Sequence, residues 1–135
     1  RSGCFHPVHR RSIVVSGISD GDERRTIDYL MTMLRKLVEE INCSLFVVSH
    51  LKRPEGNKGH EEGVTTSLSH LRGSHSLAQL SDAVIGFERN QQDEIQNNVM
   101  TARVLKNRYT GDTGVACSLI YNKETGRLTE GSFDE

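Results

Sequence analysis

Two cations and two glycines stand close together in the segment LKNRYTGDTG, residues 105–114. Lys106 and Arg108 alternate with uncharged neighbours, so both side chains project from one face if a strand runs through them. A guanidinium fixed at the end of a rigid strand is typical of an arginine finger in phosphoryl transfer. Gly111 and Gly114 would ease the loop that follows. The segment therefore predicts a contact with a phosphate-bearing ligand.

The motif that cradles nucleotide phosphates, GxxxxGK[ST], does not occur in the 135 residues. A chain that has cations for phosphates but lacks this loop is either a binding module or a piece of a larger nucleotide-dependent enzyme. On the second interpretation the loop lies upstream. We then expect that this chain alone does not hydrolyse nucleoside triphosphates.

The composition allows one domain with a hydrophobic core, but the net charge creates no overall electrostatic field that would attract nucleic acid. Seventeen basic and 18 acidic residues leave a net charge of −1, so any nucleic-acid binding must use local patches. Cys4, Cys43 and Cys117 form no CxxC pair, which favours a reducing, cytoplasmic setting over a disulfide framework. No apolar run approaches the ~18 residues of a membrane span.

The first half of the sequence predicts a βαβ unit. SIVVS, residues 12–16, is a short β-branched run, and apolar residues then recur at helical spacing from Asp22 to a stop at Asn42. The continuous apolar run from Leu45 to Val48 is typical of a parallel strand that is covered on both faces. The next segment, residues 52–69, has no periodicity and is long enough to indicate a functional loop.

The second half predicts a helical turn and then several strands. The turn spans Leu77 to Leu80, and the strands are expected at residues 83–87, 99–105, 115–121 and 128–129, with a polar connection at 89–97. The predicted fold class is α/β, with a mostly parallel sheet and antiparallel C-terminal strands.

In this order, SIVVS, LFVVSHLKRP, HLRGSHSLAQLSDAVIGFERNQQ, LKNRYTGDTG and YNKETG together resemble the C-terminal half of a RecA-type hexameric replicative helicase. The resemblance covers roughly residues 12 to 130. It is strongest to the primase-helicases of short-tailed phages and their mitochondrial relative Twinkle, with the bacterial DnaB helicases further off. It implies a partial RecA-like P-loop NTPase core over residues 12–135. Residues 1–11 do not look like the family, and we interpret them as a disordered or non-native start.

The resemblance also implies roles for individual residues. His50 would sense the nucleotide state, Gln79 would link DNA to the γ-phosphate, and two cations would reach the neighbouring subunit's phosphates. The implied catalytic set is therefore Arg108, Lys106, His50 and Gln79. Two further residues, Arg89 and Tyr121, would pack around the nucleotide base. The implied contacts to single-stranded DNA are Lys58, Arg72, Gly73 and Ser74.

The implied parent is a ring-shaped helicase that moves 5′ to 3′ on single-stranded DNA, driven by an NTP and Mg²⁺. Its expected partners are single-stranded DNA, identical subunits in a hexamer, and a primase and DNA polymerase, in the cytoplasm of a bacterial host. The metal-binding carboxylate expected before the first strand falls at His9 or Arg10, so no metal site is predicted and no cofactor is expected on this chain alone.

Several residues have simpler alternative interpretations. Cys4, His6 and His9 are too few for a zinc site and favour a disordered terminus. Without the resemblance, His50 would be a strand-end histidine, and Tyr121 is equally well explained by edge packing. The alternative for the whole chain is a non-catalytic α/β module that binds single-stranded nucleic acid or a protein through residues 52–74.

Overall fold

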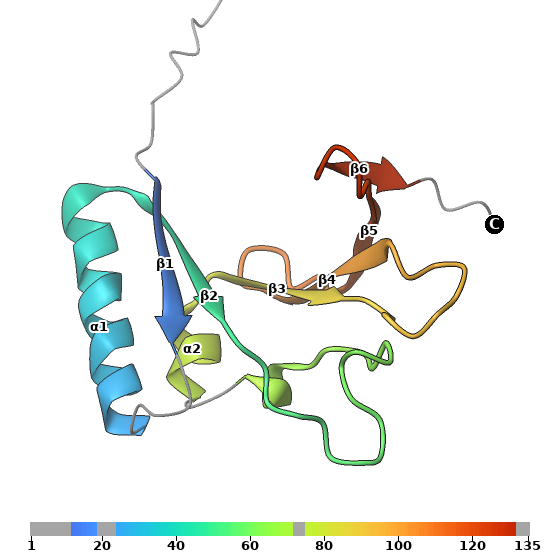
Figure 1. Ribbon diagram of the computed structural model, residues 1–135. Helices are drawn as coiled ribbons and strands as arrows, with labels where there is room; N and C mark the ends of the chain where they lie inside the picture. The colour runs from blue at the N-terminus through green and yellow to red at the C-terminus, as the bar shows by residue number, and fades with distance from the viewer. Residues whose placement is uncertain (1–11, 19–23, 72–74, 132–135) are drawn as a thin grey trace, which may run out of the picture.

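The computed structural model describes residues 12–18, 24–71 and 75–131 (Figure 1). A first unit contains strand β1 (Ser12–Ile18), helix α1 (Arg24–Ile41) and strand β2 (Ser44–Ser49). Two short helical segments follow, η1 (Leu68–His70) and α2 (His75–Leu80). Four strands complete the chain: β3 (Ala83–Glu88), β4 (Val99–Asn107), β5 (Gly114–Tyr121) and β6 (Leu128–Gly131).

The first unit is the predicted βαβ crossover. β1 and β2 pair in parallel, with Ser12 opposite Ser44. α1 lies beside this pair in Figure 1 and buries Ile27, which is only 2% exposed, together with Met31. Leu30, Leu37 and Ile41, at the same helical spacing, stay exposed. The helix stops before Asn42, whose φ of 48° is the left-handed conformation that commonly ends helices. Periodicity and stop signal therefore predicted this helix correctly.

The core of the described residues joins α1 to α2. Ile27 and Met31 of α1 pack with Leu77 of α2, and partly buried apolar residues surround them. These are Leu34, Val47, Leu71 and Leu80. Because α2 contributes a buried residue to this cluster, the core fixes α2 against α1. That fixes the start of β3 as well, since it follows α2 directly.

The prediction of a mostly parallel sheet is wrong. β3, β4, β5 and β6 form an antiparallel sheet in that order, and the sole parallel pair among the described strands is the separate β1–β2 sheet. The antiparallel C-terminal strands themselves are confirmed. The physical reason lies in the connections: successive strands from β3 onward are joined by short loops, which favour antiparallel neighbours. A parallel partner for β3 would need a long crossover.

The expectation that β2 is covered on both faces is also wrong for this chain. Phe46 is 58% exposed and Val48 is 51% exposed, whereas Val47 packs toward α1 and α2. Val14, opposite Phe46 in β1, is exposed on the same face. A continuous apolar run therefore marks a strand with one covered face and one uncovered apolar face here.

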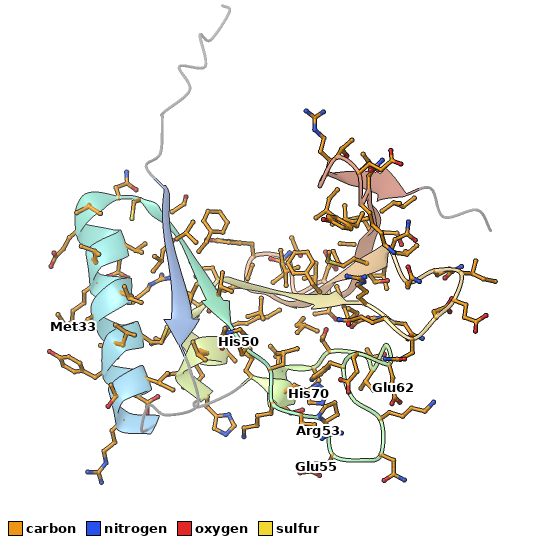
Figure 2. The ribbon with its side chains drawn as sticks, in the orientation of Figure 1. Met33, His50, Arg53, Glu55, Glu62 and His70 are labelled. Carbon is orange, nitrogen blue, oxygen red and sulfur yellow. The ribbon has the colours of Figure 1, made fainter. Side chains whose placement is uncertain are left out.

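The long loop predicted after β2 is present and is tied to the rest of the fold. A bridge pairs Leu51 with Leu71, and the amide of Lys52 donates to the carbonyl of His70. His60 packs its ring edgewise on His70, with centroids 5.2 Å apart, and a ring nitrogen of His60 lies 2.8 Å from the carbonyl of Lys52. Figure 2 shows His70 and Arg53 together in this region, below the strands.

No helix among the described residues is long and apolar enough to cross a bilayer.

Candidate functional site

Lys106 and Arg108 meet the carboxyl end of α2. The ammonium of Lys106 lies 2.5 Å from the carbonyl oxygen of Ala78 and 3.2 Å from that of Gln79. The guanidinium of Arg108 donates to the same Gln79 oxygen at 2.7 Å. Both cations therefore lie on one side of the sheet, as their spacing predicted. β4 continues to Asn107, two residues beyond the predicted end, so Arg108 directly follows a strand.

The last carbonyls of a helix have no partner within the helix and carry partial negative charge, so they attract cations. α2 is only six residues long, which leaves most of its carbonyls available. The two side chains for which the sequence predicted a phosphate contact thus bind the carboxyl end of α2 in this structure. The loop that follows them turns through Gly111 and Gly114, whose positive φ angles of 79° and 133° suit glycine.

Asp82 completes the surroundings of Arg108. Its carboxylate lies 3.0 Å from the guanidinium of Arg108 and 2.9 Å from that of Arg35 on α1. Its backbone carbonyl accepts from the amide of Arg108 at 2.8 Å. Arg35 also pairs with Glu39, one turn further along α1. The hydrogen bond to Asp82, followed by that to Glu39, raises the pKa of Arg35 above its ordinary value.

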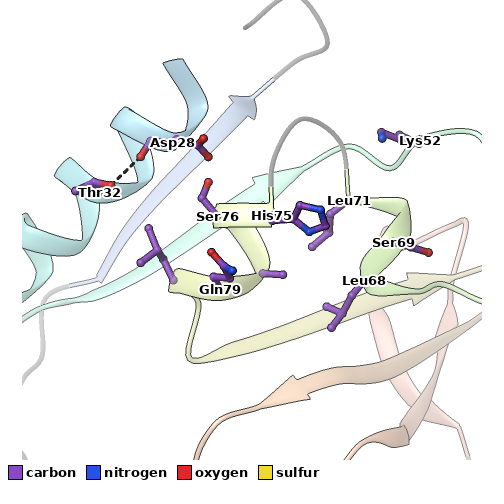
Figure 3. A pocket seen from close by; sticks show the side chains of 11 residues that line it. Asp28, Thr32, Lys52, Leu68, Ser69, Leu71, His75, Ser76 and Gln79 are labelled. Carbon is purple, nitrogen blue, oxygen red and sulfur yellow. Dashed lines mark hydrogen bonds between the residues drawn. The ribbon is translucent and has the colours of Figure 1, made fainter. Parts of the chain in front are cut away.

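The backbone carbonyl of Gln79 lies next to both cations, while the Gln79 side chain is exposed at a surface hollow. The hollow has a volume of about 760 Å³ and lies between α1, α2, η1 and Lys52. Figure 3 shows the Gln79 amide at this hollow, beside Ser76 and facing Asp28 and Thr32 of α1. The structure therefore brings together three of the four residues in the predicted catalytic set.

His50, the fourth member, is exposed and directly follows β2 (Figure 2). Lys58 is exposed in the long loop. The other three predicted DNA contacts, Arg72, Gly73 and Ser74, lie outside the described residues.

Arg89 and Tyr121 lie together at the opposite end of the four-stranded sheet. Arg89 follows β3 and its side chain donates to the carbonyl of Asn97 at 2.5 Å. Tyr121 ends β5, and its amide donates to the carbonyl of Asn98 at 2.9 Å. Arg89 also lines a small hollow of about 160 Å³.

Arg89 and Tyr121 are thus anchored to the turn that leads into β4, whereas Lys106 and Arg108 stand at the far end of β4. At about 3.3 Å per residue, the strand separates the two sets by roughly 25 Å.

A buried carboxylate lies beside Arg89. The Glu88 side chain is 8% exposed and receives hydrogen bonds from the amide and hydroxyl of Thr66, at 2.7 and 2.8 Å. Arg103 of β4 donates two more, at 2.7 and 3.2 Å. Burial alone would raise the pKa of Glu88, but the bonds from Arg103 and Thr66 outweigh it and hold that pKa below its ordinary value. Gly86 makes the contact possible, because a Cβ there would overlap the Thr66 hydroxyl.

Sequence reasoning missed the residues that organise both ends of the sheet. Asp82 stands three residues after Gln79, and an acid between a helical turn and a strand was an available signal for a partner of a cation. Glu88 and Arg103 could have been paired only from the strand register, in which Glu88 faces Thr101 and Arg103 lies diagonally two residues on. Among the described residues, no three His, Cys, Asp or Glu side chains are grouped to hold a metal ion.

No family model matches the sequence. The chain is 50% identical over 122 residues to the DNA helicase/primase of Enterobacteria phage T3. The match covers 90% of this chain but 21% of the phage protein, so the chain spans about a fifth of that relative's length. The expected resemblance is confirmed over the matched segment: this chain is similar to part of a phage DNA helicase/primase.

Proposed function

We propose that this chain forms part of a ring-shaped, NTP-driven DNA helicase in which one subunit contributes residues to two different nucleotide sites. The proposal rests on the separation along β4: Arg89 and Tyr121 are at one end, and Lys106 and Arg108 are at the other. Roughly 25 Å separates them, so the two pairs would serve different nucleotides. The base-contacting pair would act on the subunit's own NTP, and the cations on the phosphates of its neighbour's NTP.

The attachment of Arg108 to its own chain is compatible with this role. A guanidinium carries five N–H donors in a fixed fork. Its bonds to Gln79 and Asp82 use one terminal nitrogen each, and the side chain is still 44% exposed. Arg108 can therefore remain anchored while its other donors point at a phosphate. Lys106 would supply a second positive charge beside it.

The proposal includes a RecA-like core that is completed by the rest of the protein. The uncovered apolar face of the β1–β2 pair, formed by Val14, Phe46 and Val48, suits a further layer of the same domain. His50, at the carboxyl end of β2, occupies the sheet edge at which ligands of open α/β sheets bind. The part of the chain that the structure describes has no group of three His, Cys, Asp or Glu side chains for a metal ion, and in this proposal Mg²⁺ would be held with the NTP by the rest of the protein.

Single-stranded DNA would lie along the ring's channel, with Lys58 and residues 72–74 on its phosphates. The complete protein would form a hexamer in the host cytoplasm, move 5′ to 3′, and work beside a primase and a DNA polymerase.

A second function is favoured by one observation: both cations already have acceptors within the chain. If their role is only to stabilise the end of α2, the chain is a non-catalytic α/β module that binds single-stranded nucleic acid or protein through residues 52–74.

A chimaera separates the two functions. The matching segment of the phage T3 helicase/primase is replaced by this chain, and DNA-stimulated NTP hydrolysis is measured for Arg108→Ala. A finger at the transition state predicts a loss in kcat on the order of 10³, with little change in thermal stability. Arg127→Ala, an exposed arginine in the turn before β6, is the matched control and should retain full activity. An Arg108→Ala chimaera with unchanged kcat would support the module.

A further inference from the structure

Asp82 holds Arg108 at both ends of its side chain. The Asp82 carbonyl accepts the Arg108 amide at 2.8 Å, and the Asp82 carboxylate accepts the guanidinium at 3.0 Å. When the backbone amide and the guanidinium of one arginine bind the same residue, its long side chain is restricted to few conformations. The Gln79 carbonyl, 2.7 Å from the other terminal nitrogen, fixes the plane of the guanidinium.

Asp82 is itself held by α1. Its second carboxylate oxygen receives Arg35 at 2.9 Å, so one carboxylate joins a guanidinium from the long helix to a guanidinium at the end of β4. α1 also packs on α2 through the buried Ile27, Met31 and Leu77. The Arg108 guanidinium is thus connected to the core of the fold through Asp82 and Arg35. Its position does not depend only on the loop after β4.

These ion pairs add little to stability. The side chains of Arg35, Asp82 and Arg108 are 33%, 34% and 44% exposed, and solvent-accessible pairs of this kind contribute little to folding. Their geometry is nevertheless specific, because both carboxylate oxygens and the backbone carbonyl of Asp82 are each engaged by a different donor. Positioning explains this arrangement better than stabilisation does.

We infer that Asp82, oriented by Arg35, is a positioning residue that holds the Arg108 guanidinium for contact with a nucleoside triphosphate in the neighbouring subunit. This inference rests on the proposed function. Misplacing a catalytic group by about 1 Å costs up to roughly 100-fold in rate. Loss of Asp82 should therefore reduce turnover strongly while leaving nucleotide affinity nearly unchanged.

The test is a double-mutant cycle in the chimaera, with ATP as the probe. Asp82→Asn should lower kcat on the order of 10- to 100-fold with little change in KM. In the Arg108→Ala background the same substitution should change kcat less than twofold, because a residue that acts through Arg108 has nothing left to position. Glu39→Gln is the matched control: it removes the other partner of Arg35, and kcat should stay at the starting value.

Asp82→Glu tests positioning separately from folding, since it keeps the charge but displaces the carboxylate by one methylene. The inference expects a lowered kcat at unchanged melting temperature. Equal losses from Asp82→Asn with and without Arg108, or full activity of Asp82→Glu and Asp82→Asn, would overturn it. If Arg108→Ala itself leaves kcat unchanged, the proposed function fails first, which is a distinguishable result.

Discussion

Replacing the buried Glu88 by Gln should destabilise the chain by about 2 kcal/mol. One carboxylate oxygen takes three of the four hydrogen bonds, from the amide and hydroxyl of Thr66 and from Arg103, and the other oxygen takes the fourth. Gln keeps an oxygen for the first three, but without charge, and turns an NH₂ group toward Arg103. A charge-assisted hydrogen bond is worth roughly 1.5–3 kcal/mol and a neutral one about 1 kcal/mol. Losing the charge-assisted bond to the second oxygen therefore accounts for a loss of about 2 kcal/mol.

Urea unfolding of the 135-residue chain measures the loss directly, as a lower midpoint at unchanged slope. Glu94→Gln, which changes an exposed glutamate in the connection between β3 and β4, is the matched control and should leave the unfolding midpoint unchanged.

The pH dependence of the stability difference between the original chain and Glu88→Gln gives a second check. Because the pKa of Glu88 is lowered in the folded chain, its stabilisation is fully present above the ordinary value of 4.5 and is lost as the pH falls through the folded pKa.

The difference between the original chain and Glu88→Gln should therefore be constant from about pH 6 to 8 and shrink below the ordinary pKa of Glu88. A variant as stable as the original chain at neutral pH would refute the reasoning. So would a difference that persists unchanged in acid.

Three further predictions concern the other parts of the account. Gly86→Ala should destabilise the chain by roughly 1–3 kcal/mol, because its Cβ would overlap Thr66; urea unfolding measures it, and an unchanged midpoint contradicts the packing. Single-stranded DNA should bind weakly and with a shallow salt dependence, and Lys58→Ala should reduce the slope of log K against log salt by about 0.7 in fluorescence anisotropy; tight binding that this change leaves unaltered would remove Lys58 from the interface. Arg89→Ala in the chimaera should raise the KM for ATP with kcat nearly unchanged, as expected for a residue that binds the base equally in ground and transition states; a lost kcat at constant KM would assign it another role.

The sequence predicted those features that depend on local pattern. The helical spacing of α1 and its stop at Asn42 are properties of neighbouring residues, and so is the alternation that places Lys106 and Arg108 on one side. The long loop after β2 followed from its lack of periodicity and its Pro and Gly content. For the site, the resemblance implied separate roles for Gln79 and for the two cations, and the contact of both cations with the Gln79 carbonyl is a finding of the structure.

Features that depend on pairing between distant segments were not predictable in the same way. An apolar run such as Leu45–Val48 suits a strand covered on both faces and a strand with one uncovered face equally well, so cover on both faces was wrongly inferred although the parallel pairing with β1 was right. The contacts of Glu88 with Thr66 and of Asp82 with Arg35 span 22 and 47 residues, and no short-range pattern encodes them. Register and packing decide such contacts.

The most direct test of a shared site is complementation between two inactive chimaeras. One carries Arg108→Ala. The other retains Arg108 but has its phosphate-binding loop, contributed by the rest of the protein, disabled by substitution. If Arg108 acts on the neighbour's nucleotide, random mixing should place an intact loop beside an intact finger at about a quarter of the subunit interfaces and restore hydrolysis. If mixed rings hydrolyse NTP no faster than either variant alone, Arg108 does not serve a neighbouring subunit and the central claim is contradicted.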